Sequence, residues 1–205
     1  MEQTKTIAMA VMISVLILCI IIMAIFEGKN HTVKKLMLTC VLPSISIVSR
    51  LIFAVTPGFK PVSAMVMITG MYLGCESGFY CGAMTALITN FYFGQGSYTP
   101  FQMLAWGVIG IISGLFSKVL RKNKPALILS GAVFGALFSL IMDVYSTVWT
   151  FGKFSINGYF VMLASSFSFT VIYAVSNVIF LLALSGPVGR KLEHTITKYS
   201  VCKTC

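Results

Sequence analysis

Long apolar runs alternate with short polar segments along the whole chain. A helix needs about 20 apolar residues to cross the ~30 Å hydrocarbon core of a bilayer, and several runs reach that length. Proline, which is favoured in the first turn of a helix, opens some of the later runs. The pattern predicts an all-α integral membrane protein. Its helices are expected at residues 7–26, 32–53, 61–74, 78–93, 101–118, 126–149 and 158–185.

Turns are expected where glycine, proline and charged residues interrupt the apolar runs. These places are a turn at 75–77, a basic loop at 118–124, a polar hairpin at 151–157, and Gly186-Pro187 at the end of the last helix. Pro43 falls inside the second run, where a membrane helix tolerates it if neighbouring groups satisfy the freed carbonyl. The run 61–74 would be only about 21 Å long, so it predicts a short, tilted or partly buried helix.

The composition supports a membrane location. Of the 205 residues, 58% are hydrophobic and 10% are charged, which is more apolar surface than a water-soluble core can hide. The net charge of +10 comes from basic residues between the apolar runs, which fits a membrane topology better than nucleic-acid binding. In a zigzag topology most basic residues share one side, with only Lys5, Arg50, Lys60 and Lys153 on the other. The positive-inside rule then predicts a multi-pass cell-membrane protein with its N-terminus outside and its C-terminus in the cytoplasm.

The six cysteines do not predict a disulfide framework. Most of them lie within or beside apolar runs, where cysteine packs as a small hydrophobic residue: Cys19, Cys40, Cys75 and Cys81. Cys202 and Cys205 form a single C-x-x-C pair whose role stays open. A structural zinc site needs four ligands and the chain has only two histidines, so no metal site is predicted.

Motifs of common enzymes are absent from the sequence. It contains no G-x-x-x-x-G-K-[ST], no H-E-x-x-H and no G-x-S-x-G. Of the five acidic residues only Asp143 lies well inside an apolar run, so paired-carboxylate catalysis lacks its second group. No catalytic residue is predicted, and an enzyme ranks below a transporter.

Three ionisable residues lie in or beside predicted membrane segments. A charge costs roughly 3 kcal/mol at the centre of a membrane helix, so Arg50, Lys60 and Asp143 require an explanation. Lys60 could extend to the outer surface, and Arg50 could anchor a helix end. Asp143 could pair with Arg50 to hold the bundle, or it could contact a polar ligand.

Amide and aromatic side chains are concentrated around one predicted outer loop. Asn90, Gln95 and Gln102 flank it, and the rings on both sides are Phe91, Tyr92, Phe93, Tyr98, Phe101 and Trp106. An interfacial aromatic belt explains the rings alone. A pocket for an amide-bearing or heteroaromatic solute uses both, because rings provide stacking area and amides fix orientation. We favour the pocket.

Small residues recur at every fourth position. They are Gly70, Gly74, Gly78, Gly82 and Ala86, with further pairs at Gly110/Gly114 and Gly131/Gly135. This spacing lets membrane helices approach closely and predicts a compact bundle.

Two segments carry a family resemblance: residues 60–64 (KPVSA) and residues 90–107 (NFYFGQGSYTPFQMLAWG). Together with the glycine-rich helix pair between them, they resemble the substrate-binding S-components of energy-coupling factor (ECF) vitamin transporters. Cobalamin-type or unassigned S-components are the nearest subset. The resemblance implies a six-helix S-component bundle plus one extra N-terminal transmembrane helix. The corresponding segments are an N-terminal helix and cytoplasmic loop (1–31), a solute-binding domain (32–189) and a basic cytoplasmic tail (190–205).

The resemblance also implies a function in solute capture. The implied substrate-binding residues are Arg50, Lys60, Asn90, Gln95, Tyr98, Gln102 and Trp106, and Asp143 is a further candidate. The implied partners are a transmembrane coupling subunit and two ATPase subunits, which use ATP, while this chain binds no cofactor. Cobalamin is the favoured solute, and riboflavin, folate, pantothenate and queuosine-like solutes remain alternatives. The rival hypothesis is an autonomous proton-coupled secondary transporter that uses Asp143.

Two departures from the family pattern affect these expectations. Ser97-Tyr98 stands where the family often has Pro-Trp, which could change the specificity of the pocket. The partner-docking surface of the family carries Ala-x-x-x-Ala, whereas here Cys40 and Ser44 occupy that spacing with Pro43 between them. Cys40 and Ser44 are therefore the expected docking residues.

Overall fold

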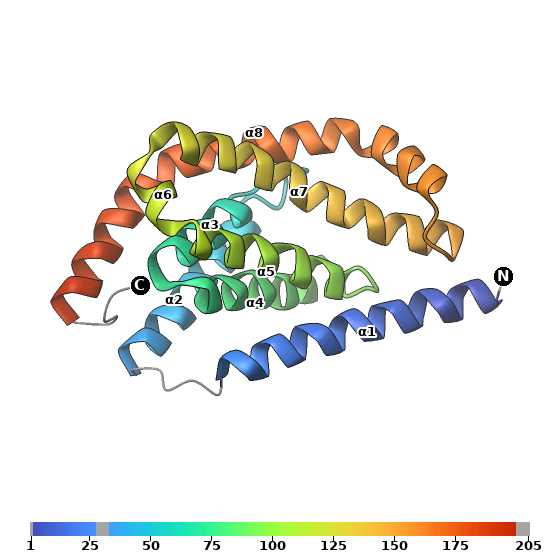
Figure 1. The fold of residues 1–205 in the computed structure, drawn as a ribbon, viewed down its shortest axis with the longest axis horizontal. Coiled ribbons are helices and arrows are strands. Elements are labelled where there is room, and N and C mark those ends of the chain that lie inside the picture. Colours follow the sequence, from blue (N-terminus) through green and yellow to red (C-terminus); the bar gives the residue numbers. More distant parts are fainter. Residues whose placement is uncertain (1, 28–32, 200–205) are drawn as a thin grey trace.

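The computed structural model describes residues 2–27 and 33–199, and all regular structure in these ranges is helical (Figure 1). The helices are α1 (Glu2–Glu27), α2 (Val33–Ile52), α3 (Val62–Leu73), α4 (Cys75–Phe93), α5 (Thr99–Leu115), α6 (Ser117–Lys122), α7 (Lys124–Phe151) and α8 (Ile156–Tyr199). Among the described residues, α2, α7 and α8 are long and apolar enough to cross a membrane. The shorter apolar helices are the segment Met9–Ile25 of α1 and the two helices α3 and α5. The prediction of an all-helical chain is confirmed for these residues.

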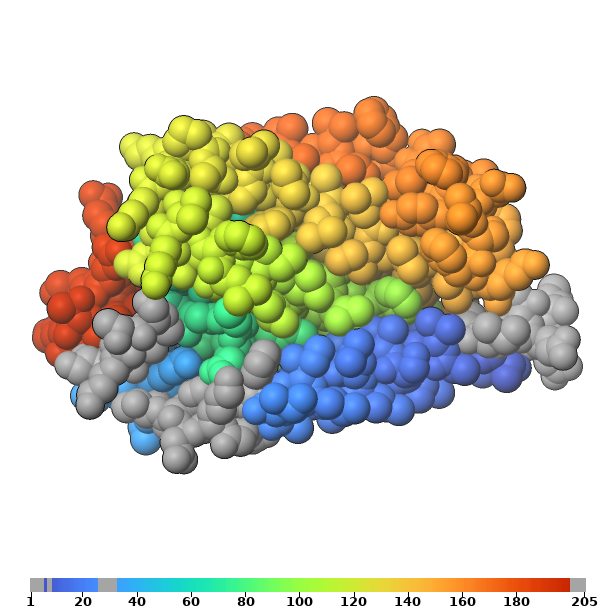
Figure 2. Space-filling view, viewed as in Figure 1, coloured from blue at the N-terminus to red at the C-terminus, as the bar shows by residue number. Residues whose placement is uncertain are grey.

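Large apolar side chains cover much of the outer surface. Ile13 on α1 is 58% exposed and Phe167 on α8 is 66% exposed. Figure 2 shows α1 (blue) and the first part of α8 (orange) as bands on the outside of the molecule. Contiguous exposed apolar surface of this kind is typical of a protein that faces lipid.

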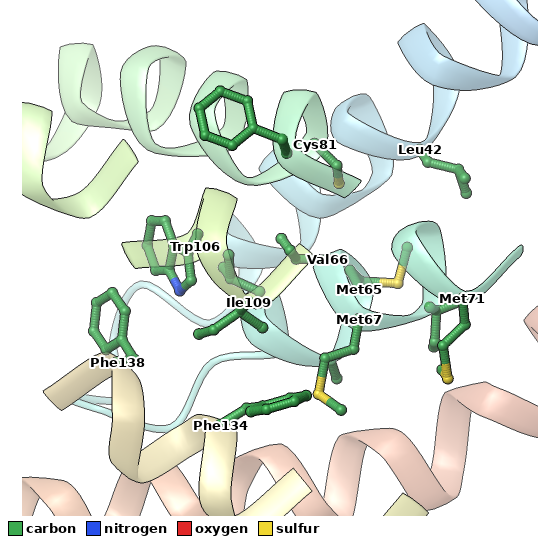
Figure 3. Close-up of a cluster of buried hydrophobic side chains, with 14 of the residues drawn as sticks. Leu42, Met65, Val66, Met67, Met71, Cys81, Trp106, Ile109, Phe134 and Phe138 are labelled. Carbon is green, nitrogen blue, oxygen red and sulfur yellow. The ribbon is translucent and has the colours of Figure 1, made fainter. Parts of the chain in front are cut away.

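Three central helices, α3, α4 and α5, form the core of the bundle. The α7–α8 hairpin packs on one side of them, and α1 runs along the other side against α5 and α4 (Figure 1). The buried side chains at the centre include Met67 of α3, Ile109 of α5, and Phe134 and Phe138 of α7 (Figure 3). On α1, Cys19 is fully buried, so this helix packs on the bundle and is more than a tether.

Glycines bring the central helices into backbone contact. A Cβ atom added to Gly78 of α4 would lie 2.6 Å from the carbonyl oxygen of Gly110 on α5 and 2.8 Å from the Cα of Gly70 on α3. Because real Cβ atoms do not approach other atoms so closely, only glycine fits at Gly78 with the helices in this position. The predicted close approach of helices along the small-residue positions is confirmed.

Two predicted turns are wrong. Residues 75–77 instead form the start of α4. Gly74 alone separates α3 from α4, and its φ of 94° is a conformation that suits glycine. The basic loop at 118–124 is mostly helical, since α6 covers Ser117–Lys122 and only Asn123 separates it from α7.

The predicted end of the last helix at Gly186-Pro187 is also wrong. Helix α8 continues through Pro187 to Tyr199 and crosses the boundary expected between residues 189 and 190. Contacts beyond the proline explain this: Leu192 is buried, and Arg121 Nη2 lies 2.5 Å from Glu193 Oε1. This packing offsets the hydrogen bond that proline removes from a helix. Cys202 and Cys205 lie outside the described residues.

Candidate functional site

The side chain of Arg50, in the last turn of α2, points into the bundle. It is only 6% exposed, and its Nη1 donates hydrogen bonds to Thr89 Oγ1 and, at 3.2 Å, to Asn90 Oδ1. Both acceptors are on α4. A residue that anchors a helix end at the membrane surface keeps its charge in water, so Arg50 does not fit that alternative.

The predicted amides meet in one hydrogen-bond network at the ends of α4 and α5. Asn90 Nδ2 donates to Thr99 Oγ1 at 2.9 Å and to Gln102 Oε1 at 3.0 Å. Thr99 Oγ1 donates to Gln95 Oε1 at 3.0 Å. Asn90 is fully buried and has partners for both its oxygen and its nitrogen, so it is held in one orientation and joins Arg50 to the loop.

Aromatic rings surround the two cations of the site. Arg50 Cζ lies 4.9 Å from the ring centroid of Phe93 and 4.8 Å from that of Trp106. Lys60 Nζ lies 4.4 Å from the Phe93 centroid, so the Phe93 ring forms cation–π contacts with both cations. Such cation–π contacts contribute about 0.5–2 kcal/mol each.

Trp106 is part of the wall of the site. Its ring stacks on Phe138 with centroids 4.8 Å apart and planes inclined by 10°, and its Nε1 donates to Ser63 Oγ at 3.2 Å (Figure 3). Since the residue is only 5% exposed and already contacts Phe138 and Arg50, it supports the site from within the core and offers little open stacking surface.

Lys60 lies in the loop between α2 and α3 and is half-buried. Burial lowers the pKa of its ammonium group, and the nearby charge of Arg50 lowers it further. Its backbone oxygen accepts a hydrogen bond from Ser176 Oγ on α8 at 3.3 Å. The loop is thereby attached to α8 while the side chain reaches toward Phe93.

Among the described residues, the side chains of Asp143 and Tyr98 form no hydrogen bond with Arg50 or with the amides Asn90, Gln95 and Gln102. Asp143, on α7, accepts a hydrogen bond from Ser166 Oγ of α8 at 2.7 Å. No ion pair joins it to Arg50, so this part of the expectation is wrong: each residue is bonded to a different helix. Tyr98 donates its hydroxyl to Gly94 O, and its ring lies 6.5 Å from that of Tyr145 on α7.

The expected docking residues, Cys40 and Ser44, are exposed on α2. Both line two surface grooves. One is a groove of about 490 Å³ along α2, and the other, of about 650 Å³, lies between α1, α2 and α4. The first has an almost entirely apolar lining that includes Val41, Ile45 and Val48. The structure therefore presents these two residues on an apolar surface.

Sequence reasoning missed the threonines of the network. Thr89 and Thr99 link Arg50, Asn90 and Gln95, yet a hydroxyl in an apolar run is too common to be distinctive. Their positions in the sequence could have indicated them, because Thr89 directly precedes Asn90 and Thr99 directly precedes Pro100 in the first turn of α5.

Fold and site together define an all-helical bundle with helices long enough to cross a membrane and a buried, cationic, amide-rich site at one end of its central helices. Searches with protein-family models, curated proteins and solved structures found no match to the chain.

Proposed function

We propose that this chain is the solute-capture subunit of an ECF-type importer. It binds a vitamin or cofactor precursor at the outer face of the cell membrane, with its N-terminus outside. A transmembrane coupling subunit and two ATPase subunits then drive release inward, so the chain itself is not an enzyme. The proposed architecture is the six-helix S-component bundle with α1 as the extra N-terminal helix.

One observation carries this proposal. Arg50, Lys60 and the neighbouring amides Asn90 and Gln102 come from three segments of the sequence, and each has a contact within one cluster of cations, amides and rings. These residues include members of both segments that resemble S-components. A site with fixed polar groups and aromatic walls suits the binding of an organic solute.

Cobalamin remains the favoured solute, with riboflavin, folate, pantothenate and queuosine-like compounds as alternatives. Amides such as Gln95 and Gln102 can bind the amide groups of cobalamin, and rings can contact the flat ring systems of the alternatives. The experiment that tests capture is native mass spectrometry of the purified full chain, which would detect a co-purified solute. A chain that retains no solute, and binds none of these vitamins when each is added, contradicts the proposal.

Substituting Gln102 tests the site itself. We expect Gln102→Ala to weaken solute binding by about 10-fold, because a hydrogen bond to a solute and the orientation of Asn90 are both lost. Ser165→Ala, an exposed hydroxyl on α8 that bonds only its own helix, is the matched control. If both variants bind the solute with equal affinity, the amide cluster has a structural role and does not bind the solute.

The rival function is an autonomous proton-coupled secondary transporter. Its support is Asp143, which is 4% exposed and accepts a hydrogen bond from the Ser166 hydroxyl. Buried carboxylates in membrane proteins often mark proton pathways. Proteoliposomes that contain only this chain distinguish the two functions: proton-driven uptake that disappears in Asp143→Asn would overturn the ECF proposal.

A further inference from the structure

The candidate site contains two cations and no neutralising carboxylate among the described side chains. Arg50 is buried, and its Nε has no hydrogen-bond partner in the described part of the chain. Lys60 approaches the same Phe93 ring that Arg50 contacts. The polar partners of the guanidinium, Thr89 and Asn90, are neutral groups.

The described carboxylates are all bonded elsewhere. The chain has five acidic residues, and those with described side chains are Glu76, Asp143 and Glu193. Glu76 pairs with Lys35 at 3.3 Å, Glu193 pairs with Arg121, and Asp143 accepts from Ser166. None of them forms an ion pair with Arg50 or Lys60.

A pair of cations in this position is energetically unfavourable without an anion. Desolvating one ion costs several kcal/mol, and two like charges beside one ring also repel each other. The contacts with Phe93 and Trp106 return only about 0.5–2 kcal/mol each. An anion that contacts both side chains would remove the repulsion and supply the missing partner of Arg50 Nε.

We propose that Arg50 and Lys60 bind an oxyanion, a carboxylate or a phosphate, carried by the captured solute. This inference rests on the capture function proposed above and specifies the class of its substrate. Arg50 provides a planar set of donors that suits carboxylate and phosphate, and Lys60 provides a second positive charge from the loop between α2 and α3. Asn90 is a positioning residue, because it holds the guanidinium in place through Oδ1.

Phe93 lies at the end of α4, beside both cations. Its ring contacts both of them. Gly94 follows with φ 99° and has open space where a Cβ would be. In this proposal the oxyanion lies beside Arg50 and Lys60, next to the Phe93 ring.

The test uses small probes that differ in charge but not in shape. Benzoate and benzamide form such a pair, and phenyl phosphate distinguishes phosphate from carboxylate. Thermal unfolding of the purified full chain in detergent is measured with each probe, for wild type, Arg50→Gln, Lys60→Gln and the control Arg121→Gln. Arg121 is a matched control because its guanidinium pairs with Glu193 on the exposed surface.

We expect benzoate or phenyl phosphate to raise the Tm of wild type and of Arg121→Gln, with benzamide having little effect. In Arg50→Gln the dissociation constant of the anionic probe should rise about 10- to 100-fold, the range for a hydrogen bond to a charged group. Lys60→Gln should weaken it by a smaller factor. Because Lys60 is in a loop, this second variant keeps the test decisive if Arg50→Gln does not fold.

The outcomes separate this inference from the capture proposal. Benzamide binding as tightly as benzoate, or a neutral solute in native mass spectrometry, overturns the oxyanion site while capture stands. A phospholipid as the bound species, displaced by the anionic probe, shows that the cations bind a lipid phosphate and also overturns it. If no solute is retained and neither anionic probe binds, both the oxyanion site and solute capture are refuted.

Discussion

Replacing Gly78 with alanine tests whether the glycine contacts set the geometry of the site. In Gly78→Ala the new methyl carbon would lie 2.6 Å from Gly110 O and 2.8 Å from Gly110 C. Ordinary contacts of this kind are about 3.5–4.0 Å long, so α4 and α5 must separate by about 1 Å. The obstacles are backbone atoms, which cannot rotate away as a side chain would. Overpacking of this type costs about 1–3 kcal/mol.

The displacement should also reach the amide network, because Asn90 is on α4 and Gln102 is on α5. Their hydrogen bond is 3.0 Å long, and a further 1 Å of separation would break it. We therefore expect both a lower Tm in detergent and, under the proposed capture function, weaker solute binding. Each is measured on the same sample, by thermal unfolding and by native mass spectrometry.

Gly186→Ala is the matched control. Gly186 is also within a helix, but no atom of the described residues lies within 4 Å of an added Cβ there. Since alanine favours helix by about 1 kcal/mol over glycine, this variant should unfold at the wild-type temperature or slightly above it. A Gly78→Ala protein with wild-type Tm and wild-type binding would refute the argument that backbone contact at Gly78 positions the site.

Two further predictions concern Trp106 and Ser44. Trp106→Ala should weaken solute binding and also lower the free energy of unfolding by about 3–5 kcal/mol, because the ring is buried between Arg50 and Phe138. Thermal unfolding and a binding assay on the same sample check this, and an unchanged Tm would contradict it. Ser44→Leu should leave solute binding intact but weaken co-purification with the coupling subunit, because Ser44 lines the apolar surface of α2. Normal assembly of the variant would show that this surface does not dock the coupling subunit.

The sequence predicted the parts of the fold that depend on local pattern. Apolar length predicted the helices, and the density of amides around one loop predicted Asn90, Gln95 and Gln102 as neighbours, as the network shows. Such residues are close in sequence, so a short loop between two helices is enough to bring them together.

The wrong expectations depended on contacts between distant segments. Gly186-Pro187 has the composition of a helix end, but the packing of Leu192 and the Arg121–Glu193 pair continue α8 beyond it. The Arg50–Asp143 pair was inferred from opposite charge alone. Whether two helices face each other depends on the order of helices around the bundle, which charge does not determine.

The same pair of helices carries both the glycine contacts and the amide network. On α4, Gly78 and Gly82 meet the backbone of α5, and two to three turns further along Asn90 bonds Gln102 across the same pair. The glycines hold the two backbones at a fixed distance, so the amide nitrogen of Asn90 reaches α5 while its oxygen remains available for Arg50 of α2. Close packing in the core therefore orients a buried guanidinium that charge alone would place at the membrane surface. In the proposed capture function, the geometry of this guanidinium is determined before a solute binds, which reduces the ordering that binding requires.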